Sequence, residues 1–171
     1  MRPAYRAPLN TFRDGVSPLE PDPSWFWSPS HAEGLSWDKT HGHNDSASLS
    51  IHNPAPRLAY WEVPLGPDFW MAPLPAIRQR LSGWVRTESA GKPGAYLAYR
   101  YSNYQIETGQ ASPFRENTCL PITGSQDWTY VEFTIEAPPA GATRAYLRLA
   151  LDGTGDAWFD GVTLGPEPDP P

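Results

Sequence analysis

The chain has 171 residues, enough for one domain with its own hydrophobic core. Its formal net charge of -6 at pH 7 argues against nucleic acid and anionic membrane surfaces as partners, because both attract basic patches. With one cysteine, Cys119, no intrachain disulfide can form, and no apolar run approaches the roughly 20 residues of a membrane span. The 21 prolines and 14 glycines indicate short strands and turns rather than long helices.

Seven segments alternate apolar and polar residues with a period of two, which is typical of strands with one buried face. In chain order they are 47–52, 58–63, 80–87, 95–101, 128–136, 145–151 and 157–164. Seven strands separated by Pro- and Gly-rich turns predict an all-β fold, a β-sandwich jelly roll of two antiparallel sheets. We expect an N-terminal extension over 1–9, the domain over 10–164, and a Pro-rich linker stub over 165–171.

The alternation also predicts which side chains leave the core. In the fourth segment Leu97 is expected to point inward. Tyr99 and Tyr101 follow it at every second position and should point the same way, whereas Tyr96 and Arg100 should face outward. A β-bulge would shift this register and turn Tyr99 and Tyr101 outward instead.

Six short motifs follow one another along the chain: NTFR at 10–13, PSW at 23–25, SLSI at 48–51, SGWVRT at 82–87, DWT at 127–129 and GDAWFDGVTL at 155–164. In this order they resemble the jelly-roll carbohydrate-binding modules of the galactose-binding-like type. The resemblance implies a non-catalytic polysaccharide-binding module, tethered to the catalytic domain of a carbohydrate-active enzyme. It also implies an extracellular or cell-surface location, although the N-terminus lacks the apolar segment of a signal peptide.

The last motif places an aspartate, Asp160, directly behind two aromatic residues. In modules of this type that aspartate helps bind a structural calcium, together with a glutamate of the opening turn. Here Arg13 stands where the glutamate is expected, and a guanidinium cannot ligate a cation. Three readings stay open: Asp14 or Asp45 supplies the missing carboxylate for calcium, Arg13 pairs directly with Asp160, or Asp160 is a solvated residue at a β-bulge.

The resemblance also implies a sugar-binding surface on one sheet, where flat rings meet the apolar faces of sugars and polar side chains bond their hydroxyl groups. The outward side chains Tyr130 and Glu132 suit such a surface. Each choice has a structural alternative: Trp61 shares parity with Val63 and suits the core, and Arg100 with Glu132 suits a cross-strand ion pair. The candidate carbohydrate-binding residues are Trp61, Tyr96, Arg100, Tyr104, Tyr130 and Glu132.

Catalysis finds little support in the sequence. His41 and His43 lie near Asp38 and Asp45, but two histidines separated by one residue in a loop fix no metal geometry. The carboxylates are too scattered to nominate the paired acid and base of a glycosidase. The main alternative to a binding module is a structural or adhesion β-sandwich without a sugar site, because this fold also serves as a scaffold.

Overall fold

The computed structural model describes residues 27–44, 47–65, 74, 76–103, 114 and 116–167. Within these ranges the regular elements are all strands, and none of the described residues forms a helix able to cross a membrane. The strands are β1 (Ser28–Pro29), β2 (Leu35–Asp38), β3 (Ser48–Leu65), β4 (Gln79–Ser102), β5 (Glu116–Thr118), β6 (Ile122–Ile135) and β7 (Arg144–Pro166). The predicted all-β class is confirmed.

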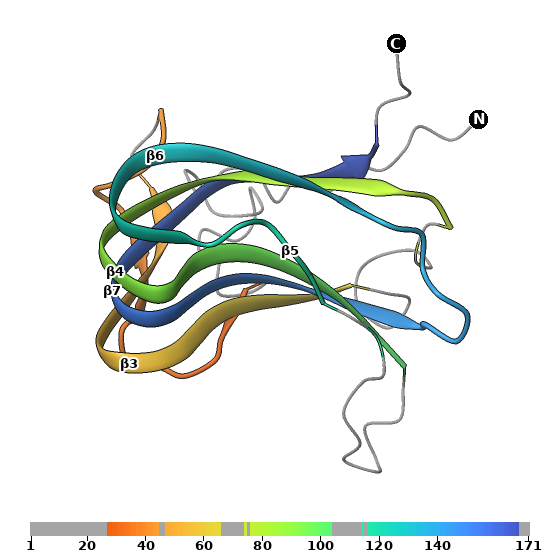
Figure 1. The fold of residues 1–171 in the computed structure, drawn as a ribbon, viewed down its shortest axis with the longest axis horizontal. Helices are drawn as coiled ribbons and strands as arrows, with labels where there is room; N and C mark the ends of the chain where they lie inside the picture. Colours follow the sequence, from red (N-terminus) through yellow and green to blue (C-terminus); the bar gives the residue numbers. More distant parts are fainter. Residues whose placement is uncertain are drawn as a thin grey trace.

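Three strands are much longer than the usual 3–10 residues. β3, β4 and β7 have 18, 24 and 23 residues, and each joins two of the segments that the sequence predicts. Their pairing register shifts midway, between Asn53 and Arg57 in β3 and between Glu88 and Gly94 in β4. In Figure 1 all three ribbons curve round at one end of the molecule and run back. The sheet is therefore folded over into two facing layers.

Each layer takes one half of every long strand, and all pairs are antiparallel. The first layer has the order β2–β3–β7–β4–β6, and the second has β1–β3–β7–β4–β5. This arrangement is the predicted β-sandwich jelly roll. Alternation does not reveal β1, β2 and β5, because runs of two to four residues are too short to establish a period of two.

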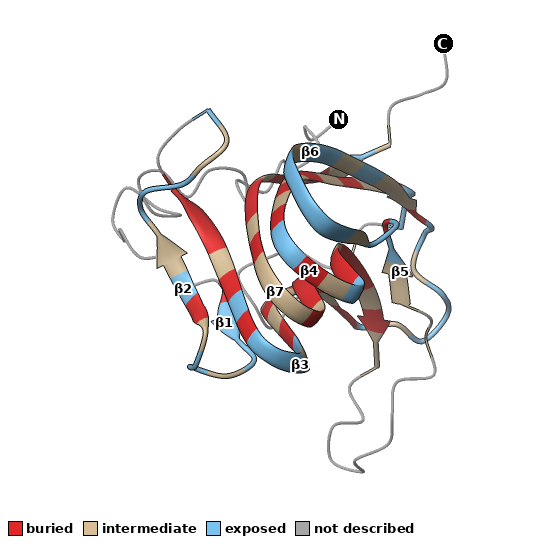
Figure 2. Ribbon diagram, turned by 60° about the vertical axis from the view of Figure 1, so that its left-hand side comes forward, coloured by how far each residue is buried: buried red, intermediate tan, exposed pale blue. Residues whose placement is uncertain are grey.

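Apolar side chains from both layers meet in one core. Figure 2 shows buried positions alternating with less buried ones along β3, β4 and β7. Leu97, Tyr99 and Tyr101 are 0%, 1% and 3% exposed, so their predicted inward parity is confirmed and the bulge alternative is wrong. Full burial of a side chain such as Leu97 contributes about 1.5–3 kcal/mol to the free energy of unfolding. The Tyr101 hydroxyl is satisfied because it donates to the Glu136 carbonyl at 2.7 Å.

The fold-over depends on glycines where β7 passes between the layers. Gly153 and Gly155 have φ angles of 125° and 98°, in the region that favours glycine. A Cβ on Gly155 would lie 2.4 Å from the Ser89 carbonyl oxygen, and one on Gly153 would lie 2.9 Å from the Lys92 carbonyl oxygen. Both contacts are with the bend of β4. The two bends therefore pack backbone against backbone, with no room for a side chain between them.

Gly155→Ala is expected to lower the free energy of unfolding by about 2–5 kcal/mol, because positive φ costs an alanine about 1–2 kcal/mol and the carbonyl overlap about 1–3 kcal/mol more. The matched control is Gly141→Ala, since Gly141 also has positive φ (87°) but no atom within 4 Å of an added Cβ. Thermal unfolding should show a clearly larger drop in melting temperature for Gly155→Ala. Equal drops would mean that the close packing of the bends is unimportant.

Candidate functional site

The outer face of the second layer gathers aromatic and charged side chains from its central strands. Residues directly opposite one another across a ladder lie on the same face, so the pairing register places Tyr60 and Tyr96 beside Arg100, Tyr146 and Arg148. We call these five residues the tyrosine–arginine face. Its cross-strand rows are Tyr60–Ala150–Tyr96, Glu62–Arg148–Ala98–Thr118 and Pro64–Tyr146–Arg100–Glu116.

Two small residues lie in the middle of this face. Ala98 is 0% exposed and Ala150 is 1% exposed, whereas Tyr96 and Tyr146 beside them are half-buried. Because an alanine side chain is one methyl group, the longer side chains extend beyond these positions. Both methyl groups are buried, so the accessible surface of the face comes from the larger side chains.

Arg148 is held in place by two neighbours on β3. Its Nε donates to a carboxylate oxygen of Glu62, and its guanidinium carbon lies 4.2 Å from the centroid of the Tyr60 ring. Burial alone would lower the pKa of Arg148, but the hydrogen bond and the charge of Glu62 outweigh burial and raise it. Arg148 is therefore a fixed, fully charged group that needs no rearrangement before it meets a ligand.

The hydroxyl of Tyr96 stays protonated near neutral pH. Partial burial is the main cause that raises the pKa of Tyr96, and the negative charges of Glu116 and Asp152 raise it further, against the opposing charge of Arg148. A neutral phenol can both donate and accept a hydrogen bond. Tyr96 therefore offers a two-way hydrogen-bonding group to a polar ligand.

Two of the predicted site residues, Tyr96 and Arg100, lie together on this face, and Tyr104 lies outside the described residues. Trp61 does not reach a surface: it is 4% exposed, and its indole N–H donates to the Ser50 carbonyl at 3.1 Å. This corrects the assignment of Trp61 to a sugar-binding surface, because its parity with Val63 directs it into the core.

Tyr130 and Glu132 lie on β6, on the outer face of the first layer, which is the opposite side of the sandwich. The Tyr130 hydroxyl donates to Glu132 at 3.0 Å, and Glu132 lies 3.7 Å from Arg80. The expected cross-strand pair of Arg100 with Glu132 is therefore wrong, since Arg80 takes that place. The structure does not bring Tyr130 and Glu132 together with Tyr96 and Arg100.

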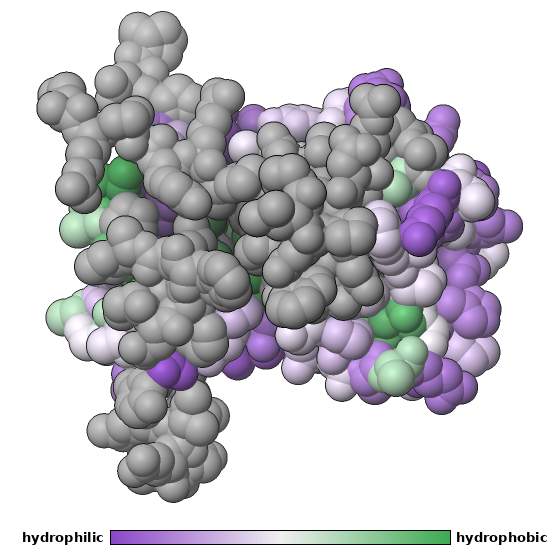
Figure 3. Space-filling model, turned by 180° about the vertical axis from the view of Figure 1, so that it is seen from behind, coloured by the Kyte–Doolittle hydropathy of each residue, from purple (hydrophilic) through white to green (hydrophobic). Residues whose placement is uncertain are grey.

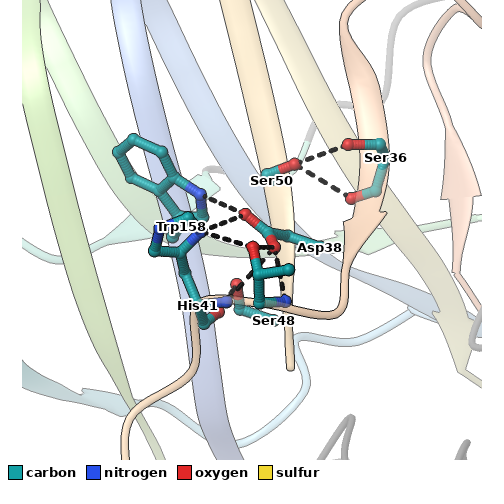
Figure 4. Close-up of polar contacts among 7 residues, drawn as sticks. Ser36, Asp38, His41, Ser48, Ser50 and Trp158 are labelled. Carbon is teal, nitrogen blue, oxygen red and sulfur yellow. Dashed lines mark hydrogen bonds and ion pairs between the residues drawn. The ribbon is translucent and has the colours of Figure 1, made fainter. Parts of the chain in front are cut away.

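Figure 4 shows the polar network at the edge of the first layer. Asp38 accepts the backbone N–H of Thr40 at 2.8 Å and its hydroxyl at 2.7 Å, while the Trp158 indole N–H donates to its other oxygen at 2.9 Å. His41 Nδ1 lies 2.9 Å from that same oxygen, and Ser48 Oγ donates to the His41 carbonyl at 2.5 Å. These groups satisfy one another, so the network holds the loop after β2 against the layer.

Asp160, the carboxylate behind the two aromatic residues, is 1% exposed and belongs to the same layer. One of its oxygens accepts the backbone N–H of His43 and the other accepts that of Gly161, both at 2.7 Å. The His43 ring in turn stacks on Trp84, with centroids 3.7 Å apart. The reading of Asp160 as a solvated residue is therefore wrong. Instead, this carboxylate fastens the loop to the last strand.

The calcium prediction rests on Asp160 with Asp14 or Asp45, and the last two lie outside the described residues, as does Arg13. Among the described residues, no three His, Cys, Asp or Glu side chains gather closely enough to hold a metal ion. Calcium stays a prediction that depends on the other two aspartates.

Sequence reasoning missed Tyr60, Glu62, Tyr146 and Arg148 as site residues. The signal for two of them was present, because placing the leucines of 145–151 inward leaves Tyr146 and Arg148 outward. Alternation alone does not predict which residue of the adjacent strand lies opposite a given residue. The face becomes visible only when β3, β7 and β4 are set side by side.

No protein-family model matches the chain, and no curated protein sequence matches it. Solved structures do match. A "Family 16 Carbohydrate Binding Module-2" is 18% identical over 81% of this chain and 89% of its own, with a TM-score of 0.57. The CBM22-1 xylan-binding domain of Paenibacillus barcinonensis Xyn10C is 10% identical over 95% and 94%, with a TM-score of 0.63. The chain has the fold of carbohydrate-binding modules.

A larger match places such a module beside an enzyme. The Clostridium thermocellum N-terminal endo-1,4-beta-D-xylanase 10B structure contains CBM22-1 and GH10 modules complexed with xylohexaose. It is 15% identical over 98% of this chain and 29% of that chain, with a TM-score of 0.66. At such identities the likeness establishes the carbohydrate-binding-module fold, and binding has to be argued from this chain's own residues.

The Asp38 network predicts a specific acid sensitivity. Partial burial would raise the pKa of Asp38, but hydrogen bonds from Thr40, His41 and Trp158 lower it well below its ordinary value. Because the folded pKa is depressed, this stabilisation is present above the unfolded pKa of about 3.9 and is lost as pH falls below it.

Asp38→Asn should therefore lower the free energy of unfolding at pH 7 by about 1–3 kcal/mol, since the variant loses bonds to a charged acceptor. Between pH 4 and 2 the wild type should lose more stability than the variant. Urea unfolding at several pH values measures both quantities. Parallel pH profiles for the two proteins would show that Asp38 is not held ionised by this network.

Proposed function

We propose that this protein is a non-catalytic polysaccharide-binding module that holds a sugar chain on the tyrosine–arginine face. The observation that carries the proposal is that three tyrosines and two arginines from three adjacent strands share one outer face. Sugars combine apolar C–H faces with polar rims, so a surface of rings beside charged hydrogen-bonding groups matches their chemistry.

The opposite outer face supports the choice by contrast. There the His43 ring covers Trp84, and the polar groups around Asp38 bond to one another. Figure 3 shows the protein from behind, where the described residues in view are mostly hydrophilic with small separate hydrophobic patches. The tyrosine–arginine face is the better candidate for a polar, ring-shaped ligand.

Affinity for such a ligand should be modest. An open face buries only part of a flexible sugar chain, and ordering that chain costs entropy. Part of this cost is offset because Arg148 is already fixed by Glu62 and Tyr60. Glu62 is committed to that bond, which argues against its use as the acid of a glycosidase.

We further propose that the module acts as an accessory domain, outside the cell or at its surface. The support is the xylanase structure, in which a module with this fold is joined to a GH10 module. Tethering raises the effective concentration of a catalytic domain near an extended substrate without any new contact at the reacting bond. The chain's own residues then need only bind and orient the polymer.

The first test is affinity electrophoresis against a panel of soluble polysaccharides, with Tyr96→Ala as the site variant. At least one polymer should retard the wild type, and the variant should bind it about tenfold more weakly, equivalent to about 1.4 kcal/mol. The matched control is Tyr130→Ala, because Tyr130 is 48% exposed on the opposite layer. Its affinity should stay within about twofold of wild type.

The opposite results are equally informative. Retardation by no polymer would favour a structural or adhesion module. A loss in Tyr130→Ala rather than in Tyr96→Ala would move the binding surface to the first layer. A parallel series with EDTA tests calcium, since weaker retardation with EDTA would show that an ion supports the binding conformation.

A further inference from the structure

Arg100 is the unusual member of the tyrosine–arginine face. Its guanidinium carbon lies 5.8 Å from the centroid of the Tyr146 ring, and its Nε is buried without a hydrogen-bond partner. In the described part of the chain Arg100 forms no ion pair, although Glu116 lies directly across the β4–β5 ladder. A guanidinium has five N–H donors, and a buried donor that stays unpaired is costly. Arg100 therefore carries a positive charge that no carboxylate of the described residues balances directly.

Arg148 shows the difference on the same face. Its Nε donates to Glu62, so its charge is already balanced within the protein. Among the described residues, Arg100 has a ring contact with Tyr146 and no hydrogen bond to a carboxylate. The positive charge that the face offers to a ligand is thus that of Arg100.

We propose that Arg100 binds a carboxylate of the ligand, and hence that the ligand is a polysaccharide containing uronic acid. This inference rests on the proposed function of the face. A carboxylate fits the guanidinium fork with two parallel hydrogen bonds and also balances its charge. A neutral sugar hydroxyl supplies a single acceptor and no charge, so it satisfies Arg100 less completely.

The recognition has to be local. The net charge of -6 repels a polyanion at a distance, and this long-range repulsion weakens as salt screens it. Glu116, opposite Arg100, adds repulsion close to the bound carboxylate. Removing the charge of Glu116 should therefore tighten binding of an acidic polymer and leave binding of its uncharged counterpart unchanged.

The experiment measures binding of the full chain to glucuronoxylan and to polygalacturonate, each beside its carboxyl-reduced counterpart. Wild type should bind one acidic polymer at least about tenfold more tightly than the reduced form of that polymer. Arg100→Gln should lose this difference, and Arg100→Lys should keep only part of it because lysine lacks the fork. Glu116→Gln should increase the difference.

The control for net charge is Arg86→Gln. Arg86 lies on the first layer, with its guanidinium carbon 5.3 Å from the Trp158 ring centroid, and its replacement changes the total charge by the same amount. This variant should keep the preference for the acidic polymer. Thermal unfolding of every variant checks that altered binding does not come from lost folding.

The possible outcomes separate the carboxylate inference from the proposed polysaccharide binding. Equal affinity for the acidic and carboxyl-reduced polymers, or binding only to other neutral polymers, overturns the carboxylate inference and leaves polysaccharide binding standing. Equal losses in Arg100→Gln and Arg86→Gln also overturn it, because net charge would then explain the effect. Failure to bind any polymer overturns both the inference and the proposed function.

Discussion

The structure depends on the close contact between the bends of β4 and β7. At that point the backbone of Gly153 and Gly155 lies against the carbonyl groups of Ser89 and Lys92, at distances that leave no space for a Cβ. This contact lets two adjacent strands turn together from one layer into the other. The core between the layers, and the separation of the two outer faces, both follow from that turn. Without the fold-over, the side chains that now form the core would lie on an exposed face of a single sheet.

One consequence is that β4 contributes to both outer faces. Trp84, before its bend, lies on the first layer beneath His43, whereas Tyr96, after its bend, lies on the second layer beside Ala150. The two faces differ in how far their polar groups are satisfied within the protein. The network around Asp38 is closed by partners from its own loop and from β7. In the second layer, Arg100 has a ring contact and no ion pair with a carboxylate of the described residues. A surface with unmet hydrogen-bonding capacity is better suited to a polar ligand than one whose groups are already paired.

Local alternation allowed much of the fold to be predicted from the sequence. The inward set of Leu97, Tyr99 and Tyr101 follows from period-two parity, and so does the outward position of Tyr96. Parity describes a residue relative to the core, but it does not say which of two layers the residue belongs to. That is why Tyr130 was grouped with Tyr96, although the sandwich lies between them. The pairing of β7 with both β3 and β4 is a long-range property, and it was needed to place these residues.

The three strands shared by both layers also affect how the domain resists a pulling force. In both layers β7 is hydrogen-bonded on each side, to β3 and to β4. A polymer pulling along this central strand would load many ladder hydrogen bonds at once in shear, because those bonds run perpendicular to the strand. The two layers cannot be peeled apart as separate sheets, since three covalent strands pass from one to the other. This topology therefore resists separation of the two layers by force along β7.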